Sequence, residues 1–295
     1  MSSFLNILNP ETGEYIPVPA VKVVSVGDTI PDYWEEHLAE KINTIKSLQA
    51  EGGKDCFSFA VMTDMHYPSN LGKNAITLAK QILKECDIRY GLCLGDVQTR
   101  GCHATKESLL AENEDIEKML SPIRDRLLQT QGNHDGNYGS LNGTNYVYRI
   151  TPQELHSAIY RKVGLVGDVH FDESGSGYYI DDTSNKVRYI ILNTHNTAYE
   201  LNADGTQKYP NMHVCRFGQS QYNLVIEALN SIPNDSWAVV VAGHVALGTN
   251  GGYSAWGDGT TAGADCYLME NLLAAYKNKT LFSGSWTAMS ALPLR

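Results

Sequence analysis

Short apolar runs that alternate with segments of helical periodicity are the feature that most constrains the fold of this chain. Apolar runs lie at 57–63, 90–95 and 237–243, and helix-like segments at 74–86 and 218–231 precede the second and the third of them. A strand, a helix and a strand in this order form a parallel pair with a crossover helix. The sequence therefore predicts an α/β fold built on buried parallel strands.

Further elements extend the same alternation. From Asp32 onward, apolar residues recur at spacings of four and three, which is the period of a helix with one buried stripe. The capping box at 151–154, with Pro152 at the first helical position, predicts the start of another helix. The other expected elements are a helix at 105–119, a strand at 126–131 and a hairpin of strands at 177–182 and 187–194.

The composition is that of a globular chain. Of its 295 residues 42% are hydrophobic, and no apolar run approaches the roughly 20 residues that cross a bilayer. Residues 1–30 lack steady periodicity, so we expect an extended leader with short strands there and a main domain at 31–295. The first residues have neither the basic segment nor the apolar segment of a secretory signal, which predicts a cytoplasmic protein without membrane contact.

Charge and cysteine spacing argue against several other classes. The chain has 33 acidic and 23 basic residues, a net charge of −10, and no block of Lys and Arg, so general binding to nucleic acid is not expected. A bound cation would still attract an anionic substrate through its local field. The six cysteines contain no C-x-x-C pair and are expected to be reduced thiols.

Side chains that bind metals follow the apolar runs at the points where these runs end. The residues in these positions are Asp64, His66, Asp96, Asn133, His134, Asp135 and His244. Because ligands bind outside the carboxyl ends of strands in open α/β sheets, we expect the segments to converge on one crevice. Carboxylate and amide oxygens mixed with imidazole nitrogens suit Mn, Fe or Zn.

Each of these motifs has an ordinary explanation when it stands alone. Asp-x-His and Gly-Asn occur in solvated turns, Gly-Asp provides a helix N-cap, and a lone histidine is more often a buried core residue. Their joint occurrence at successive strand ends favours a metal site over these explanations.

Taken in order, the motifs resemble those of the calcineurin-like metallophosphoesterase superfamily. The series D-x-H, G-D, G-N-H-D/E and a strand-end histidine appears here at 64–66, 95–96, 132–135 and 243–244. The resemblance implies an α/β fold, a four-layer α/β-β/α sandwich of two mixed sheets, with two metal ions at the sheet edges. It makes the segment 31–295 a metallophosphoesterase domain.

The resemblance also implies a set of metal ligands. Asp64 and His66 would hold the first ion, and Asp96 would bridge both ions. Asn133 and His244 would hold the second ion.

The remaining two residues of the third motif would be catalytic. His134 would act on the substrate rather than on a metal, by stabilising charge on the phosphoryl group or by protonating the leaving oxygen. Asp135 would orient His134 from behind.

One part of the family pattern has no counterpart, because His244 is the last histidine of the sequence and no closing G-H-x-H follows it. That motif normally gives each metal one more histidine, so the second site is expected to be partly occupied or vacant. A natural shortening, an interrupted chain and substitution by other groups all remain open. The best substitute ligand is His195, which also follows an apolar run, and the weaker candidates are His213, Asp258 and Asp265.

These inferences predict a hydrolase, a metal-dependent phosphatase or phosphodiesterase that acts on a small phosphoester by in-line attack of a metal-bound hydroxide. The alternative is a metal-poor relative that binds a phosphoester or a protein partner, and a weak likeness of the leader to phage-tail leaders adds a phage or prophage association. A dinuclear hydrolase of non-phosphate substrates is disfavoured, because such sites use more histidines. The Gly-rich stretch 248–263, with Tyr253 and Trp256, is expected to line the substrate pocket.

Overall fold

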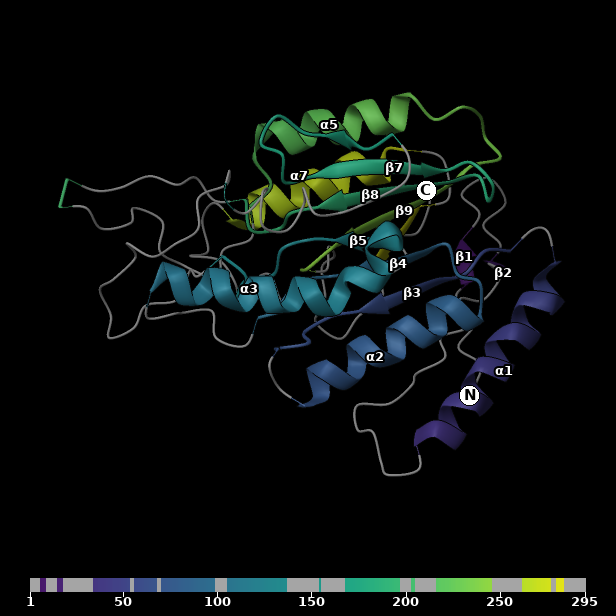
Figure 1. Cartoon of the computed structure of the whole chain (residues 1–295). Helices are drawn as coiled ribbons and strands as arrows, with labels where there is room; N and C mark the ends of the chain where they lie inside the picture. The colour runs from purple at the N-terminus through teal and green to yellow at the C-terminus, as the bar shows by residue number, and fades with distance from the viewer. Residues whose placement is uncertain are drawn as a thin grey trace.

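A computed structural model of the chain describes residues 6–8, 15–17, 34–53, 56–67, 70–98, 105–136, 154, 168–196, 203–204, 216–245, 262–276 and 280–283. Within these residues, two sheets lie face to face and helices cover their outer sides, which gives four layers (Figure 1). The predicted α/β sandwich is confirmed.

The smaller sheet is parallel in its described strands and has the order β3-β4-β5. Its strands are β3 (Phe59–Met62), β4 (Tyr90–Cys93) and β5 (Leu127–Gln129). The helices of this half are α1 (Trp34–Gly52), α2 (Asn70–Glu85) and α3 (Lys106–Leu120), the last followed by the 3-10 turn η2 (Ser121–Arg126). The two connections are therefore the expected crossovers, one through α2 and one through α3.

The larger sheet has the order β10-β9-β8-β7-β6 and is mixed, because β8, β9 and β10 are parallel while β6, β7 and β8 are antiparallel. Its strands are β6 (His170–Phe171), β7 (Tyr178–Asp182), β8 (Val187–Leu192), β9 (Ala238–Gly243) and β10 (Thr280–Ser283). The helices α5 (Gly218–Asn230) and α7 (Ala262–Ala274) cover its outer face.

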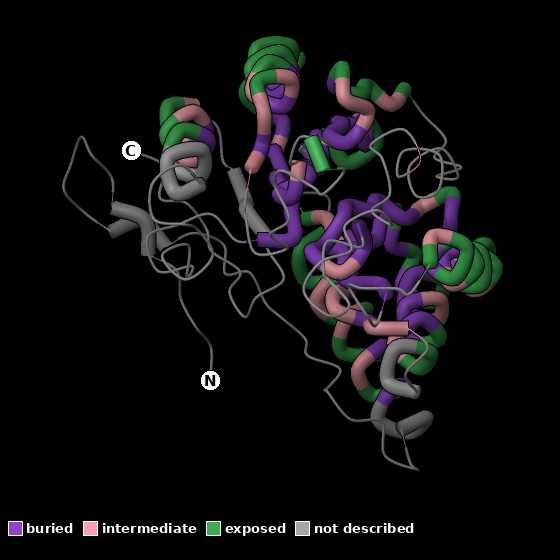
Figure 2. The backbone as a smooth tube through the Cα atoms, turned by 90° about the vertical axis from the view of Figure 1, so that its left-hand side faces the viewer, coloured by how far each residue is buried: buried purple, intermediate pink, exposed green. Residues whose placement is uncertain are grey.

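Strand β8 shows how the sequence produces these layers. Its side chains alternate between the faces of the sheet, as the period of a strand requires. Val187, Tyr189 and Ile191 pack between the two sheets, whereas Ile190 and Leu192 pack beneath α5 and α7. Both faces are buried, so the strand is a continuous apolar run. Figure 2 shows the buried residues concentrated at the centre and the exposed residues on the outer sides of the helices.

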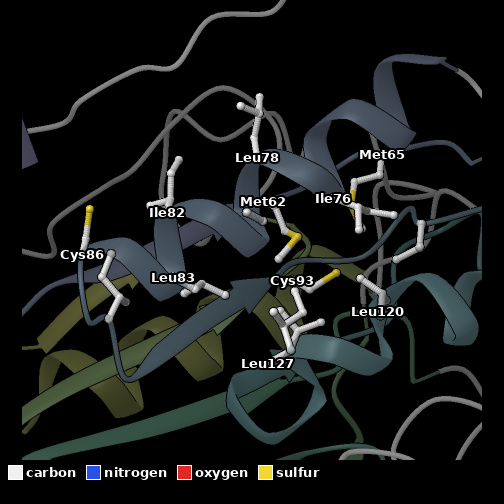
Figure 3. Close-up of a cluster of buried hydrophobic side chains, with 14 of the residues drawn as sticks. Met62, Met65, Ile76, Leu78, Ile82, Leu83, Cys86, Cys93, Leu120 and Leu127 are labelled. Atoms are coloured by element: carbon white, nitrogen blue, oxygen red, sulfur yellow. The ribbon is translucent and has the colours of Figure 1, made fainter. Parts of the chain in front are cut away.

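The core on the outer side of the smaller sheet is equally well packed (Figure 3). Ile76 and Leu83 of α2 are fully buried there, and Cys93 points to them from β4. This packing holds β4 rigidly from both sides, and the candidate site begins directly after its last residue.

The structure describes only parts of two predicted regions, the leader and the helix that begins at 151–154. The leader contains a two-stranded antiparallel sheet, β1 (Asn6–Leu8) with β2 (Tyr15–Pro17), and the domain boundary at residue 30 stays a prediction. The helix predicted from the capping box at 151–154 lies outside the described residues except for Glu154. No helix in the described ranges is both long enough and apolar enough to span a membrane.

Candidate metal centre

The loops that follow β3, β4, β5 and β9 meet at one edge of the sandwich. Two groups of side chains there have ligand atoms within 4.8 Å of one another, Asp64 with Asp96 and His244, and His66 with Asp96 and His134. Asp96 belongs to both groups. The prediction that these segments converge at one site is therefore confirmed.

The site has a buried part and a partly exposed part. We call Asp96, Asn133 and His244 the floor, because they are 2%, 3% and 0% exposed. We call Asp64, His66 and His134 the rim, because their side chains are 29%, 34% and 27% exposed.

The imidazole of His244 is fixed in one tautomer by the backbone. Its Nδ1 lies 2.8 Å from the carbonyl oxygen of Leu94, which can only accept a hydrogen bond, so Nδ1 carries the proton. Burial lowers the pKa of His244, which keeps the ring neutral near pH 7. The other nitrogen, Nε2, therefore presents a lone pair.

The lone pair on Nε2 of His244 faces the side-chain oxygen of Asn133. Nε2 lies 2.8 Å from Oδ1 of Asn133 and 3.6 Å from Oδ2 of Asp96. Two acceptor atoms at such a distance repel each other unless a proton or a cation lies between them. The donor set of an amide oxygen, a carboxylate and an imidazole suits a first-row divalent metal, so the floor fits the metal that the fold implies.

The rim histidine His66 has the same arrangement. Its Nδ1 lies 3.0 Å from the carbonyl oxygen of Gln98, so in the neutral ring Nε2 is the acceptor, and it lies 3.9 Å from Oδ1 of Asp64. A histidine held through Nδ1–H by a backbone carbonyl is the usual geometry of a metal ligand.

The backbone at three of these residues is strained. Asp64, His66 and Asp96 have φ angles of 51°, 45° and 51°, in the left-handed region that non-glycine residues avoid. Hydrogen bonds between the two loops hold this conformation, from the amide of Asp64 to the carbonyl oxygen of Gly95 and from that of His66 to the carbonyl oxygen of Asp96. Such strain clusters at functional sites because the surrounding structure must enforce it.

Two glycines allow the second and third loops to touch. A Cβ on Gly95, where φ is +91°, would lie 2.2 Å from the backbone nitrogen of Gly132. A Cβ on Gly132 would lie 2.1 Å from Oδ1 of Asp96. Both glycines are therefore required by close approach, and Gly95 also by its positive φ.

Asp135 connects these two loops, and its contacts differ from the expected ones. Its carboxylate accepts hydrogen bonds from the backbone amides of Asp96, Val97, Gln98 and Gly132, at 2.7 to 3.2 Å. None of these four bonds goes to the imidazole of His134, whose Nδ1 is buried without a hydrogen-bond partner among the described residues. Asp135 thus fixes the backbone that carries His134, rather than its ring.

Carboxyl groups are crowded around the floor, which makes Asp96 hard to ionise while no cation is bound. Burial, together with the neighbouring carboxylates of Asp135 and Asp64, raises the pKa of Asp96 well above its ordinary value. Burial and the ring of His66 lower the pKa of His134, so it is neutral near pH 7. Clustered carboxylates and neutral imidazoles are the state that a cation would stabilise.

The expected substitute ligand, His195, is buried but belongs to neither group of ligand atoms. Its ring lies against that of His244, with 5.4 Å between the centroids, directly after β8. His195 therefore contacts the ring of a predicted ligand without belonging to either group. Of the weaker candidates, Asp265 falls within α7, while His213 and Asp258 lie outside the described residues, as do Tyr253 and Trp256.

Strand β10 was not predicted from the sequence. It pairs in parallel with β9, so its carboxyl end opens on the same edge as His244. The sequence that follows β10 is Gly284, Ser285, Trp286 and Thr287, which lie outside the described residues. This segment has the glycine of a G-H-x-H motif, but Ser and Thr stand where that motif has its histidines.

Comparison with known proteins supports the fold. The crystal structure of a dimetal phosphatase from Danio rerio matches over 77% of this chain and 80% of its own, with a TM-score of 0.52 and 12% sequence identity. No protein-family model matches the sequence, and no curated protein is significantly similar to it. The chain has the fold of the calcineurin-like metallophosphoesterases. Within that fold, it is a structural neighbour of a dimetal phosphatase and carries a candidate metal site at the expected sheet edge.

Proposed function

We propose that this protein is a metal-dependent phosphohydrolase that cleaves a small phosphomonoester or phosphodiester. The observation that carries the proposal is the pair of acceptor atoms on Asn133 and His244, which face each other beside Asp96 in the fold of a dimetal phosphatase. In an ordinary polar turn, buried acceptor atoms such as these would each face a hydrogen-bond donor instead of each other.

We propose that these residues bind two cations. Asp64 and His66 would hold one, Asn133 and His244 the other, and Asp96 would contact both. When bound, Mn, Fe or Zn ions supply Lewis acidity and lower the pKa of water, which provides a nucleophile for in-line attack on phosphorus at neutral pH.

We propose that His134 acts on the substrate. It lies on the rim, and its backbone amide donates a 2.8 Å hydrogen bond to Oδ1 of Asp96, so its position is tied to the floor. A neutral ring retains one N–H, which can donate to a phosphoryl oxygen as negative charge develops there. Tyr253 and Trp256 are proposed to contact the remainder of the substrate.

A second candidate function is a metal-poor relative that binds a phosphoester without hydrolysing it. The sequence favours this candidate, because no histidine follows His244, and hydroxyl side chains such as those of Ser285 and Thr287 are poorer metal ligands than histidines. The two candidates make the same prediction for phosphoester binding and differ in metal content and turnover.

Elemental analysis combined with an assay tests both. Bound metal per chain is measured after purification with added Mn²⁺, and hydrolysis of p-nitrophenyl phosphate and bis(p-nitrophenyl) phosphate is followed. Asp96→Asn is the inactive comparison, since it replaces the carboxylate shared by both groups. His170→Ala is the matched control, because His170 is an exposed histidine of β6 outside both groups.

We expect metal and turnover in the wild type and in His170→Ala, and loss of both in Asp96→Asn. Metal without turnover in the wild type would support the binding relative. Equal hydrolysis by the wild type and Asp96→Asn would contradict the proposed function.

A further inference from the structure

The second group of ligand atoms, His66 with Asp96 and His134, includes a residue to which the family resemblance gives no metal. We infer that His134 is itself a ligand of the cation held at His66 and Asp96 while no substrate is bound, and that a phosphoryl oxygen replaces it when substrate arrives. This inference rests on the proposed function and changes the role of one residue within it.

The distances suit two ligands of one ion better than a hydrogen bond. Nε2 of His134 lies 3.8 Å from Oδ2 of Asp96, beyond the range of a hydrogen bond. Two ligands that each lie about 2.1 Å from a tetrahedral metal are about 3.4 Å apart. The rings of His66 and His134 have centroids 4.8 Å apart and stand edge to face at 78°. One nitrogen of each ring and one carboxylate oxygen of Asp96 all lie within 4.8 Å of one another.

The two carboxylate oxygens of Asp96 have different neighbours. Its Oδ1 accepts the backbone amide of His134 at 2.8 Å. Its Oδ2 lies 3.8 Å from Nε2 of His134 and 3.6 Å from Nε2 of His244. One carboxylate oxygen therefore lies at nearly equal distances from the Nε2 atoms of two imidazoles.

Among the described residues, no further histidine joins the two ligand groups. His195, the other nearby imidazole, does not join either group. His134 is on the partly exposed rim, at 27% exposure, so its side chain has room to leave the cation without disturbing the floor.

Manganese titration in the absence of substrate tests this role directly. Binding of Mn²⁺ alone to metal-free protein is measured by calorimetry and by electron paramagnetic resonance for the wild type, His134→Ala and His134→Gln, with His170→Ala as the control. We expect His134→Ala to weaken one Mn²⁺ site at least tenfold, on the order of the loss caused by removing a ligand or its direct support. His134→Gln, which keeps an oxygen donor, should lose less, and His170→Ala should bind as the wild type does.

Inorganic phosphate supplies the second half of the test. Saturating phosphate should reduce the difference in Mn²⁺ affinity between the wild type and His134→Ala, because its oxygen takes the position of the imidazole. Unchanged Mn²⁺ affinity in His134→Ala without phosphate, with the fold confirmed by circular dichroism, would overturn the inference while leaving the proposed function in place. A wild type that binds no Mn²⁺ would overturn both.

Discussion

The floor and the rim of the candidate site consist of the same kinds of side chain, yet the fold treats them differently. Asp96, Asn133 and His244 are buried and held by the ends of β4, β5 and β9. The rim residues are partly exposed. Left-handed backbone occurs in both parts, at Asp64 and His66 of the rim and at Asp96 of the floor. A floor set by the strand ends keeps its geometry without ligand, whereas a rim open to solvent can adapt to one.

The largest expected effect compares one histidine from each part. His244→Ala should weaken Mn²⁺ binding on the order of 100-fold, because it removes a buried nitrogen ligand whose tautomer the backbone fixes. His66→Ala should weaken it about tenfold, since solvent can supply the missing ligand at the rim. Titration of both metal-free variants by calorimetry measures the difference. Equal losses would show that burial does not distinguish the two parts.

Asp135→Ala tests whether the floor depends on its support. The substitution leaves four backbone amides without their acceptor, so we expect the free energy of unfolding to fall by about 3 kcal/mol. Denaturant unfolding of the metal-free protein measures this value. Asp115→Ala is the control, because that carboxylate is 57% exposed on α3 and its loss should change stability by less than about 0.5 kcal/mol. Equal stability of the two variants would remove Asp135 from its supporting role.

The sequence predicted the framework of the floor well, because strand ends follow from local patterns. The expected strand at 90–95 appears as Tyr90–Cys93, and the expected helix at 218–231 appears as Gly218–Asn230. Buried strands must be continuously apolar, so the first polar residue after each run marks the edge of the sheet.

Contacts between distant segments could not be predicted in this way. Asp135 follows His134 directly, which suggested a local contact, but its carboxylate lies beneath a loop 37 to 39 residues earlier in the chain. The strand β10 was missed, because its four residues carry only two large apolar side chains and their pairing with β9 decides their conformation. Both features depend on tertiary packing and have no local pattern.

A pH series on metal-free protein tests the raised pKa of Asp96. In the folded state the pKa of Asp96 is raised by burial and by the carboxylates of Asp135 and Asp64, so the folded chain keeps a proton that the unfolded chain releases. Stability should therefore fall as pH rises from the unfolded pKa towards the folded one. Asp96→Asn lacks this titration, and at pH 8 it should be more stable than the wild type by about 1 to 2 kcal/mol, with a smaller difference at pH 5.

Thermal and denaturant unfolding at both pH values provide the measurement. Added Mn²⁺ should reverse the order at pH 8, because the cation stabilises the ionised carboxylate of the wild type only. A wild type that gains stability between pH 5 and pH 8, relative to Asp96→Asn, would contradict the assigned charge.

The smallest expected effect concerns two thiols that report on rigidity without taking part in the site. Cys93 ends β4, two residues before Gly95, and burial raises its pKa to about 12. Cys56 is exposed. Alkylation at pH 8 requires the thiolate, so Cys56 should react within minutes and Cys93 only when β4 opens. Peptide mapping by mass spectrometry separates the two rates, and Mn²⁺ should slow the reaction of Cys93 several-fold without changing that of Cys56. Fast labelling of Cys93 in the metal-loaded protein would mean that the floor is as mobile as the rim, which would end the distinction between them.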